Sequence, residues 1–287
     1  MVAVTVLASC GKGGLEGGGA ERLPVELLTK SGIAMISLPG GSFEMGGGKG
    51  NDDEQPGHMV KLAPFLIDKT EVTHAMFTAA QLPDPSRWKD DANKPVESLR
   101  WRDAKLYCNE RSLMEGLNPC YDERAPGLPC DFNADGYRLP TEAEWEFAAR
   151  AGADGDFDFG DPSKLGQYAV FEGNSQKRTL PVGSKKANRW GIHDLYGNVS
   201  EWCQDAYDPG YYAASPAENP TGPVAGATDV KRVIRGGSWK ASVNMCRARF
   251  RQGQLTGDSD ACFAADDCGF RCVRRPSAEE LANAQAP

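Results

Sequence analysis

The sequence predicts one loop-rich domain that mixes short helices with short strands, and three observations support this expectation. Glycine and proline are abundant, with 33 and 19 residues in a chain of 287, which favours turns and short elements over long helices. Residues 136–152 contain the start and stop signals of one short helix. The apolar run 33–38 is typical of a strand, and residues 231–239 also predict one. The length suits one large domain or two small ones, and no internal repeat or second domain is visible.

Composition narrows the possible partners and the compartment. The chain has 32 basic and 40 acidic residues and no basic patch, so nucleic acid is not expected as a partner. No apolar run approaches the ~20 residues that a membrane span needs. Nine cysteines are many for a cytosolic protein of this size, which favours an oxidising compartment. The odd number leaves one cysteine over.

The N-terminal segment offers an explanation for the odd cysteine. Leu7 to Cys10 resembles a bacterial lipobox, in which a peptidase cuts before the cysteine and a lipid is attached to it. We therefore expect a truncated lipoprotein signal at 1–9, lipidation at Cys10 and a glycine-rich flexible tether at 10–32. The expected location is the periplasmic face of the cell envelope, with membrane contact only through the lipid anchor. The alternative is an apolar N-terminus with a chance cysteine.

The segment before the central helix predicts strands first and helices later. Residues 33–38 predict a strand, residues 39–46 a turn and a strand, and residues 59–68 two strands interrupted at Pro64. The acidic residues 51–54 indicate a solvated loop. A first helix is expected to start within 71–77, and a second to end at about residue 115, before a glycine stop at Gly116.

Histidines and cysteines in this part of the chain suggest different roles. His58 and His74 are expected as loop and helix-face residues, because His193 is the only other histidine available to complete a metal site. Eight cysteines allow 105 disulfide connectivities. Sequence proximity suggests two local disulfides, one that joins Cys120 to Cys130 and one that joins Cys262 to Cys268.

Capping signals in the sequence predict both ends of the central helix. Thr141 is a candidate N-cap, and Glu144 three residues later completes a capping box. Glu142 and Glu146 add negative charge near the start of the helix, where the helix dipole favours it. Gly152 is placed to end the helix in a left-handed conformation. By itself, such a helix indicates only a well-made piece of scaffold. Beyond it, residues 153–174 and 204–230 are expected as loops, and residues 275–287 as a polar tail.

The literal string of residues 136–152, GYRLPTEAEWEFAARAG, resembles the formylglycine-generating enzyme (sulfatase-modifying factor) family. Six or so further motifs agree in order, among them GGSFEMG, EVT, GNVSEW, RGGSW and GFRC, so that the resemblance covers roughly residues 33–274. The resemblance implies a C-type-lectin-like α+β fold over 33–274. It also implies a disulfide between Cys108 and Cys272, which leaves Cys203 and Cys246 as a remaining pair.

The glycine-containing loop at 192–202 suggests a calcium site. Asp194 and Glu201 offer two carboxylates at short spacing, and Ca²⁺ takes six to eight oxygen ligands. The alternative is that both carboxylates form caps and turn hydrogen bonds. The family resemblance implies a calcium held by the side chains of Asp194 and Glu201 and by the carbonyls of Gly197 and Val199. A second family site would lie at 170–176, where the acidic ligand is missing, so it is not expected.

The family's oxidase chemistry depends on two cysteines, and one of them is absent here. The resemblance implies a Cu(I) ion held by two thiolates, which oxidises a cysteine of a sulfatase to formylglycine with O₂. The two family positions correspond to Ala241 and Cys246. Ser238 and Arg251 match other family active-site residues, whereas Ser200 stands where the family has tryptophan.

Two functions follow from this pattern. The first is a copper-dependent oxidase whose partner is a cysteine-containing protein or peptide. The second is a catalytically silent binding or envelope-structure module on the same scaffold, with an unidentified surface ligand. The missing thiolate at position 241 favours the second function. A fold does not determine a function, so the same scaffold can serve without the copper chemistry.

Overall fold

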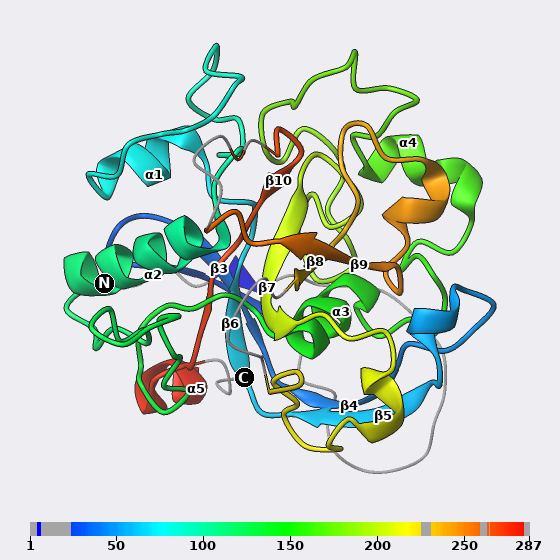
Figure 1. Cartoon of the computed structure of the whole chain (residues 1–287), viewed down its shortest axis with the longest axis horizontal. Coiled ribbons are helices and arrows are strands. Elements are labelled where there is room, and N and C mark those ends of the chain that lie inside the picture. Colours follow the sequence, from blue (N-terminus) through cyan, green and yellow to red (C-terminus); the bar gives the residue numbers. More distant parts are fainter. Residues whose placement is uncertain (1–4, 7–23, 225–230, 259–262, 264, 284–287) are drawn as a thin grey trace.

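The structure is a computed structural model that describes residues 5–6, 24–224, 231–258, 263 and 265–283. It is an α+β domain in which three small sheets and short helices surround one buried central helix, α3 (Glu142–Arg150) (Figure 1). None of the helices in the described ranges is long and apolar enough to cross a membrane. The arrangement of sheets and helices confirms the α+β fold class expected from the sequence.

The first sheet joins the two ends of the described chain. Its strand order is β1-β2-β3-β6-β11, and all of its pairings are antiparallel. β2 forms within the stretch expected as a tether, because Val25 and Leu27 are buried against β3. The ordered domain therefore begins before residue 33. The strands are β1 (Thr5–Val6), β2 (Val25–Leu28), β3 (Ala34–Leu38), β6 (Phe65–Asp68) and β11 (Val273–Arg274).

The second and third sheets lie along the central helix. β4 (Gly41–Met45) pairs with β5 (His58–Leu62), so that the interruption at Pro64 separates strands of two different sheets. The other sheet has the order β10-β7-β8-β9, with β10 parallel to β7. Figure 1 shows α3 beside β7 and β8 near the middle of the molecule. The strands of this sheet are β7 (Ser200–Ala206), β8 (Lys231–Arg235), β9 (Arg251–Leu255) and β10 (Cys268–Gly269).

The remaining helices are short, apart from α2. α2 (Trp101–Glu115) ends at Gly116, whose φ of 76° confirms the expected left-handed stop. Two helices lie in stretches expected to be irregular, α4 in the 153–174 loop and α5 in the polar tail. The helices and 3₁₀ turns not yet given are α1 (His74–Ala79), α4 (Leu165–Tyr168), α5 (Ala278–Asn283), Asp52–Glu54, Pro162–Lys164, Tyr211–Ala214 and Val243–Cys246.

The caps of α3 follow the sequence prediction. The Thr141 side chain accepts from the backbone N–H of Glu144, and the Glu144 side chain accepts from the backbone N–H of Thr141. The left-handed residue at the C-terminus is Ala151, with φ of 45°, and Gly152 follows with φ of 79°. The helix therefore ends one residue earlier than Gly152 suggested.

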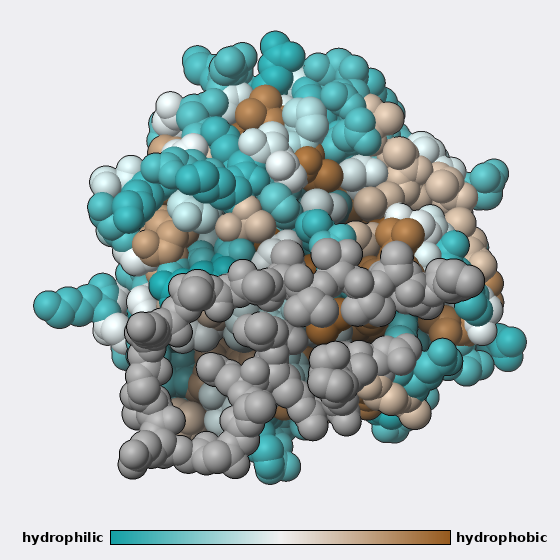
Figure 2. All heavy atoms as spheres, turned by 180° about the vertical axis from the view of Figure 1, so that it is seen from behind, coloured by the Kyte–Doolittle hydropathy of each residue, from teal (hydrophilic) through white to brown (hydrophobic). Residues whose placement is uncertain are grey.

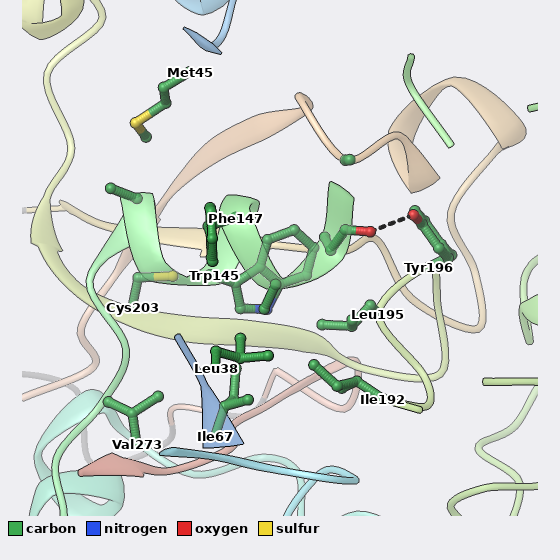
Figure 3. Packing of buried hydrophobic residues seen from close by; sticks show 14 of the residues in the cluster. Leu38, Met45, Ile67, Trp145, Phe147, Ile192, Leu195, Tyr196, Cys203 and Val273 are labelled. Atoms are coloured by element: carbon green, nitrogen blue, oxygen red, sulfur yellow. Dashed lines mark hydrogen bonds between the residues drawn. The ribbon is translucent and has the colours of Figure 1, made fainter. Parts of the chain in front are cut away.

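All nine residues of α3 are buried, including its three glutamates. Figure 3 shows Trp145 packed among Leu38, Ile192 and Leu195, with Cys203 of β7 nearby. A helix that is buried on every side needs partners for its charges. Arg235 supplies one set, since its guanidinium donates to Glu142 at 3.0 Å and to Glu146 at 2.6 Å.

A second acidic stretch is also less exposed than the sequence suggested. Residues 51–54 were expected as a solvated loop, yet the side chain of Glu54 is fully buried and accepts two hydrogen bonds from Arg247. In the upper part of the face shown in Figure 2, which is not covered by grey atoms, hydrophilic residues predominate and apolar residues lie between them. Part of the acidic composition thus serves the interior rather than the surface.

Candidate functional site

A pocket of about 530 Å³ lies over one face of the four-stranded sheet. Its floor comes from all four strands, and Ile234 of β8 lies directly opposite Gln252 of β9. The walls come from the 238–245 segment and from the residues just before β10. The lining residues are Ser200, Ile234, Ser238, Lys240, Ala241, Met245, Gln252, Gln254, Ala265, Asp267 and Cys268.

Strand alternation separates this pocket from the central helix. Neighbouring residues of a strand point to opposite faces of the sheet. Ser200 and Gln252 line the pocket, whereas their neighbours Glu201 and Arg251 bond to α3. Pocket and helix therefore lie on opposite sides of a single layer of backbone.

Arg251, a candidate catalytic residue, lies on the helix side of that layer. Its guanidinium donates to both carboxylate oxygens of Glu142, at 2.7 and 2.9 Å, and to the backbone oxygens of Asp53 and Asp208. The residue is 2% exposed and does not line the pocket. Its contacts give it a structural role in holding α3 against β9.

Ser238 and its neighbours form the polar wall of the pocket. The Ser238 hydroxyl lies 3.2 Å from a carboxylate oxygen of Asp267. Lys240 forms ion pairs with Asp266 at 3.2 Å and with Asp267 at 3.0 Å. Because the charges pair with one another, hydroxyl and amide groups remain for contact with a ligand.

Cys246 follows Met245 of the pocket wall but does not itself line the pocket. Its side chain is fully buried as a free thiol, and burial raises its pKa to about 12. Ala241, for which the family resemblance implies a thiol, lines the pocket wall. Cys203 is also a buried free thiol, so the leftover pairing of Cys203 with Cys246 is not formed in this structure.

The other cysteines come together partly as expected. The sulfur atoms of Cys108 and Cys272 lie 3.7 Å apart as free thiols in the core, and a disulfide between them stays a prediction. A hydrogen bond with the Cys130 thiol lowers the pKa of the Cys120 thiol, so these two sulfurs are also in contact. Cys262, the expected partner of Cys268, lies outside the described residues, as does Cys10.

The loop at 192–202 has a backbone that only particular residues tolerate. Gly197 has φ of 152°, and a Cβ on it would lie 2.2 Å from the carbonyl oxygen of Val170, which excludes any side chain. Asp194 and Asn198 also have positive φ, of 63° and 64°. Asn198 is held by Glu71, whose carboxylate accepts from the Asn198 amide at 2.7 Å and from the Val199 backbone N–H at 3.0 Å.

Glu71 is a site residue that the sequence did not single out. It was visible only as the first residue of the EVT motif, without a partner. In the structure it is fully buried, and its pKa is raised well above the ordinary value by burial and by the nearby charges of Asp194 and Glu201. Three buried carboxylates thus share this region with one guanidinium, that of Arg271.

The expected calcium ligands are close together, but Glu201 is already engaged. Arg271 donates to both of its carboxylate oxygens at 2.6 Å, and the Trp145 indole donates to one of them at 2.8 Å. Asp194 uses one oxygen to accept from the Gly183 backbone N–H. Within the described ranges, no group of three or more histidine, cysteine or acidic side chains is arranged to hold a metal ion. Because Asp194 accepts fewer hydrogen bonds than Glu201, its carboxylate is the more available of the two.

The histidines lie in separate places, as expected. His74 contacts Asp84 at 2.9 Å at the start of α1, whereas His193 contacts the Lys185 carbonyl at 2.9 Å. His58 lies in β5 rather than in a loop and contacts the Pro56 carbonyl.

Comparison with known proteins gives a consistent set of relatives. The sulfatase-modifying factor enzyme 1-like domain matches residues 22–276. The chain is 33% identical over 287 residues to a formylglycine-generating enzyme of Streptomyces coelicolor, with 83% of this chain and 88% of that protein covered. It is 31% identical over 273 residues to the chaperone protein LppX of Paenibacillus barcinonensis, with coverage of 84% and 89%. The solved structure of Treponema denticola variable protein 1 matches with a TM-score of 0.77 at 31% identity and covers 85% of this chain and 95% of that one.

Proposed function

The chain belongs to the sulfatase-modifying factor (formylglycine-generating enzyme) family, and from this premise we propose that it uses the family scaffold as a binding module without copper-dependent oxidation. The observation that carries the proposal is the pocket wall at position 241, where an alanine methyl group replaces a thiol. The proposed binding site is the pocket over β7, β8, β9 and β10.

The thiol chemistry does not fit a two-sulfur copper site. Soft thiolates select Cu(I), and one thiolate leaves half of such a site empty. Cys246 is fully buried, and a pKa of about 12 keeps its thiol protonated at neutral pH. Burial is the cause of this raised pKa, and it disfavours the thiolate form that would bind a soft metal ion. These residues therefore do not fit a copper ion held by two thiolates.

The groups that remain in the pocket suit reversible binding of a neutral polar ligand. Gln252 and Gln254 present amides from one face of β9, and Ser200 and Ser238 present hydroxyls. Such groups recognise amides and hydroxyls of a ligand through uncharged hydrogen bonds. Two relatives, one named a chaperone protein and one a variable protein, have names that are compatible with non-catalytic use of the scaffold. The proposal keeps the envelope location and the lipid anchor at Cys10 that the N-terminal segment predicts.

A copper-loaded assay tests this function. With Cu(I), O₂ and a sulfatase peptide that contains the target cysteine, we expect no aldehyde product by mass spectrometry above a metal-free blank. Cys246→Ser should behave as the wild type, and so should Cys203→Ser, which removes a matched buried thiol. Turnover that disappears in Cys246→Ser and persists in Cys203→Ser would establish the oxidase instead.

We further propose that calcium binds the 192–202 loop, through Asp194 and the carbonyls of Gly197 and Val199, with Glu201 beside them. The support is the group of three buried carboxyl groups, Glu71, Asp194 and Glu201, that lie near one guanidinium, that of Arg271, among the residues the structure describes. A divalent cation would favour the ionised form of these carboxyl groups and would hold the loop together.

Chelation of calcium is expected to lower the melting temperature, and Asp194→Asn should abolish that response in differential scanning fluorimetry. Glu201→Gln is the less informative variant, because it also breaks the ion pair with Arg271 and destabilises the fold without any metal. Asp267→Asn, in the pocket over β7, β8, β9 and β10, is the matched control and should respond to chelation as the wild type. An unchanged melting curve for the wild type on chelation would remove the site.

A further inference from the structure

A second pocket, of about 270 Å³, lies at the start of α3 and shares no lining residue with the first. Four distant segments meet there: the β5–β6 connection, the turn after Cys130, the loop at 219–221 and Arg275 near the C-terminus. Apolar side chains form much of its wall, among them Leu62, Phe65 and Phe132. Its volume suits a ligand about as large as one amino-acid residue.

The polar groups around this pocket are mainly hydrogen-bond donors with spare capacity. Asn219 uses its side-chain oxygen to accept from the Ala63 backbone N–H at 2.8 Å, which leaves its NH₂ group for another partner. The Asn133 side chain and the Thr221 hydroxyl have no hydrogen-bond partner in the described part of the chain. Arg275 uses one nitrogen, at 3.0 Å from the Phe132 carbonyl oxygen, and leaves its other donors available.

The charge of the pocket has the opposite sign to that of the protein. Arg138 and Glu144 neutralise one another through two hydrogen bonds, of 2.6 and 2.7 Å. Arg275 forms no ion pair with any described residue, so the lining residues carry one net positive charge in a chain of net charge −8. A guanidinium with free donors on a planar fork matches a carboxylate.

We propose that this pocket binds a carboxylate attached to an apolar body, in the form of an apolar amino-acid residue with a free α-carboxylate. The carboxylate accepts hydrogen bonds from Arg275 and from the amides of Asn133 and Asn219. The apolar side chain packs against Leu62 and Phe132. The same chemistry occurs at the C-terminus of a polypeptide and in a free acyl amino acid, so the experiment has an arm for each source.

Isothermal titration with N-acetyl-L-leucine tests the proposal, with N-acetyl-L-leucinamide as the uncharged match. The acid is expected to bind with saturation at millimolar or lower concentration, and the amide about tenfold more weakly or worse, because it lacks the charge-assisted hydrogen bonds. A short peptide that ends in leucine with a free carboxylate forms the second arm. Tighter binding of the peptide assigns the site to a chain terminus, and equal binding assigns it to free acyl amino acids.

Two exposed variants locate the binding without disturbing the core. Arg275→Gln should weaken binding of the acid about tenfold and leave the amide unchanged, and Asn133→Ala should weaken the acid by a smaller factor. Arg178→Gln is the matched control, since Arg178 is a 47% exposed arginine outside the pocket, and it should bind as the wild type. Equal affinity for acid and amide, unchanged binding in Arg275→Gln, or no saturable binding by the wild type would overturn the proposal. The first pocket is untouched by these variants, so the result is independent of the proposed function.

Discussion

Replacement of Arg235 by methionine is expected to lower the free energy of unfolding by about 3–5 kcal/mol, which is a large part of the stability of an ordinary domain. The guanidinium is fully buried and forms ion pairs with Glu142 at 3.0 Å and Glu146 at 2.6 Å. It also donates to the backbone oxygens of Ala248 and Arg249. Methionine fills similar space but leaves the carboxylate of Glu146 without this partner inside the core.

Urea denaturation measures this loss as a lower midpoint at an unchanged slope. The double variant Arg235→Met with Glu146→Gln should recover part of the loss, because it removes the carboxylate that the single variant strands. Arg178→Met is the matched control, since its pair with Asp90 is exposed and 3.5 Å long, and it should change stability by less than about 0.5 kcal/mol. A wild-type midpoint in Arg235→Met would show that the buried network contributes nothing net.

The second large effect concerns Asp205, a buried carboxyl group whose pKa is raised to about 8 by burial and by the neighbouring charges of Glu142 and Glu144. The folded state therefore binds this proton more tightly than the unfolded state does, and the protein loses stability as the group is forced to ionise. The stabilising contribution is complete below pH 4 and is lost as the pH rises through 8. Asp205→Asn mimics the protonated group, and its side-chain oxygen can still accept from the Glu142 backbone N–H, which Asp205 does at 2.9 Å.

Asp205→Asn should therefore match the wild type near pH 4 and exceed its stability at pH 8, by an amount on the order of a few kcal/mol. Melting temperatures measured across this pH range check the prediction. Asp161→Asn is the control, because that carboxyl group is exposed and only accepts a hydrogen bond from the Ser163 backbone N–H. This variant should lose stability between pH 4 and pH 8 as the wild type does. Parallel pH profiles for Asp205→Asn and the wild type would contradict the assignment of the proton to Asp205.

Features that depend on neighbouring residues were predictable. The capping box of Thr141 and Glu144 joins groups three residues apart, and the stop at Gly116 depends on one residue's conformation. The alanine at position 241 could be recognised because the RGGSW motif sets its place a few residues earlier. In each case the physical cause lies within one or two turns of chain.

Features that depend on distant partners were not predictable. Glu54 and Arg247 are 193 residues apart, so the acidic run at 51–54 looked solvated. β2 looked like part of a tether because its four residues gain their meaning only from pairing with β3. Glu71 meets the 192–202 loop more than 120 residues later. A local pattern contains no information on which of many charged residues will meet.

The sequence by itself determined the family, the α+β fold, the N-terminal cap of the central helix and the presence of an alanine at position 241. Only the tertiary structure decided that Arg251 faces the helix, that Cys246 is buried and does not line the pocket, and that Arg271 already neutralises Glu201. The physical reason is that motif spacing records what lies nearby along the chain. The face of a strand, the burial of a thiol and the partner of a charge are set by segments that fold back from elsewhere.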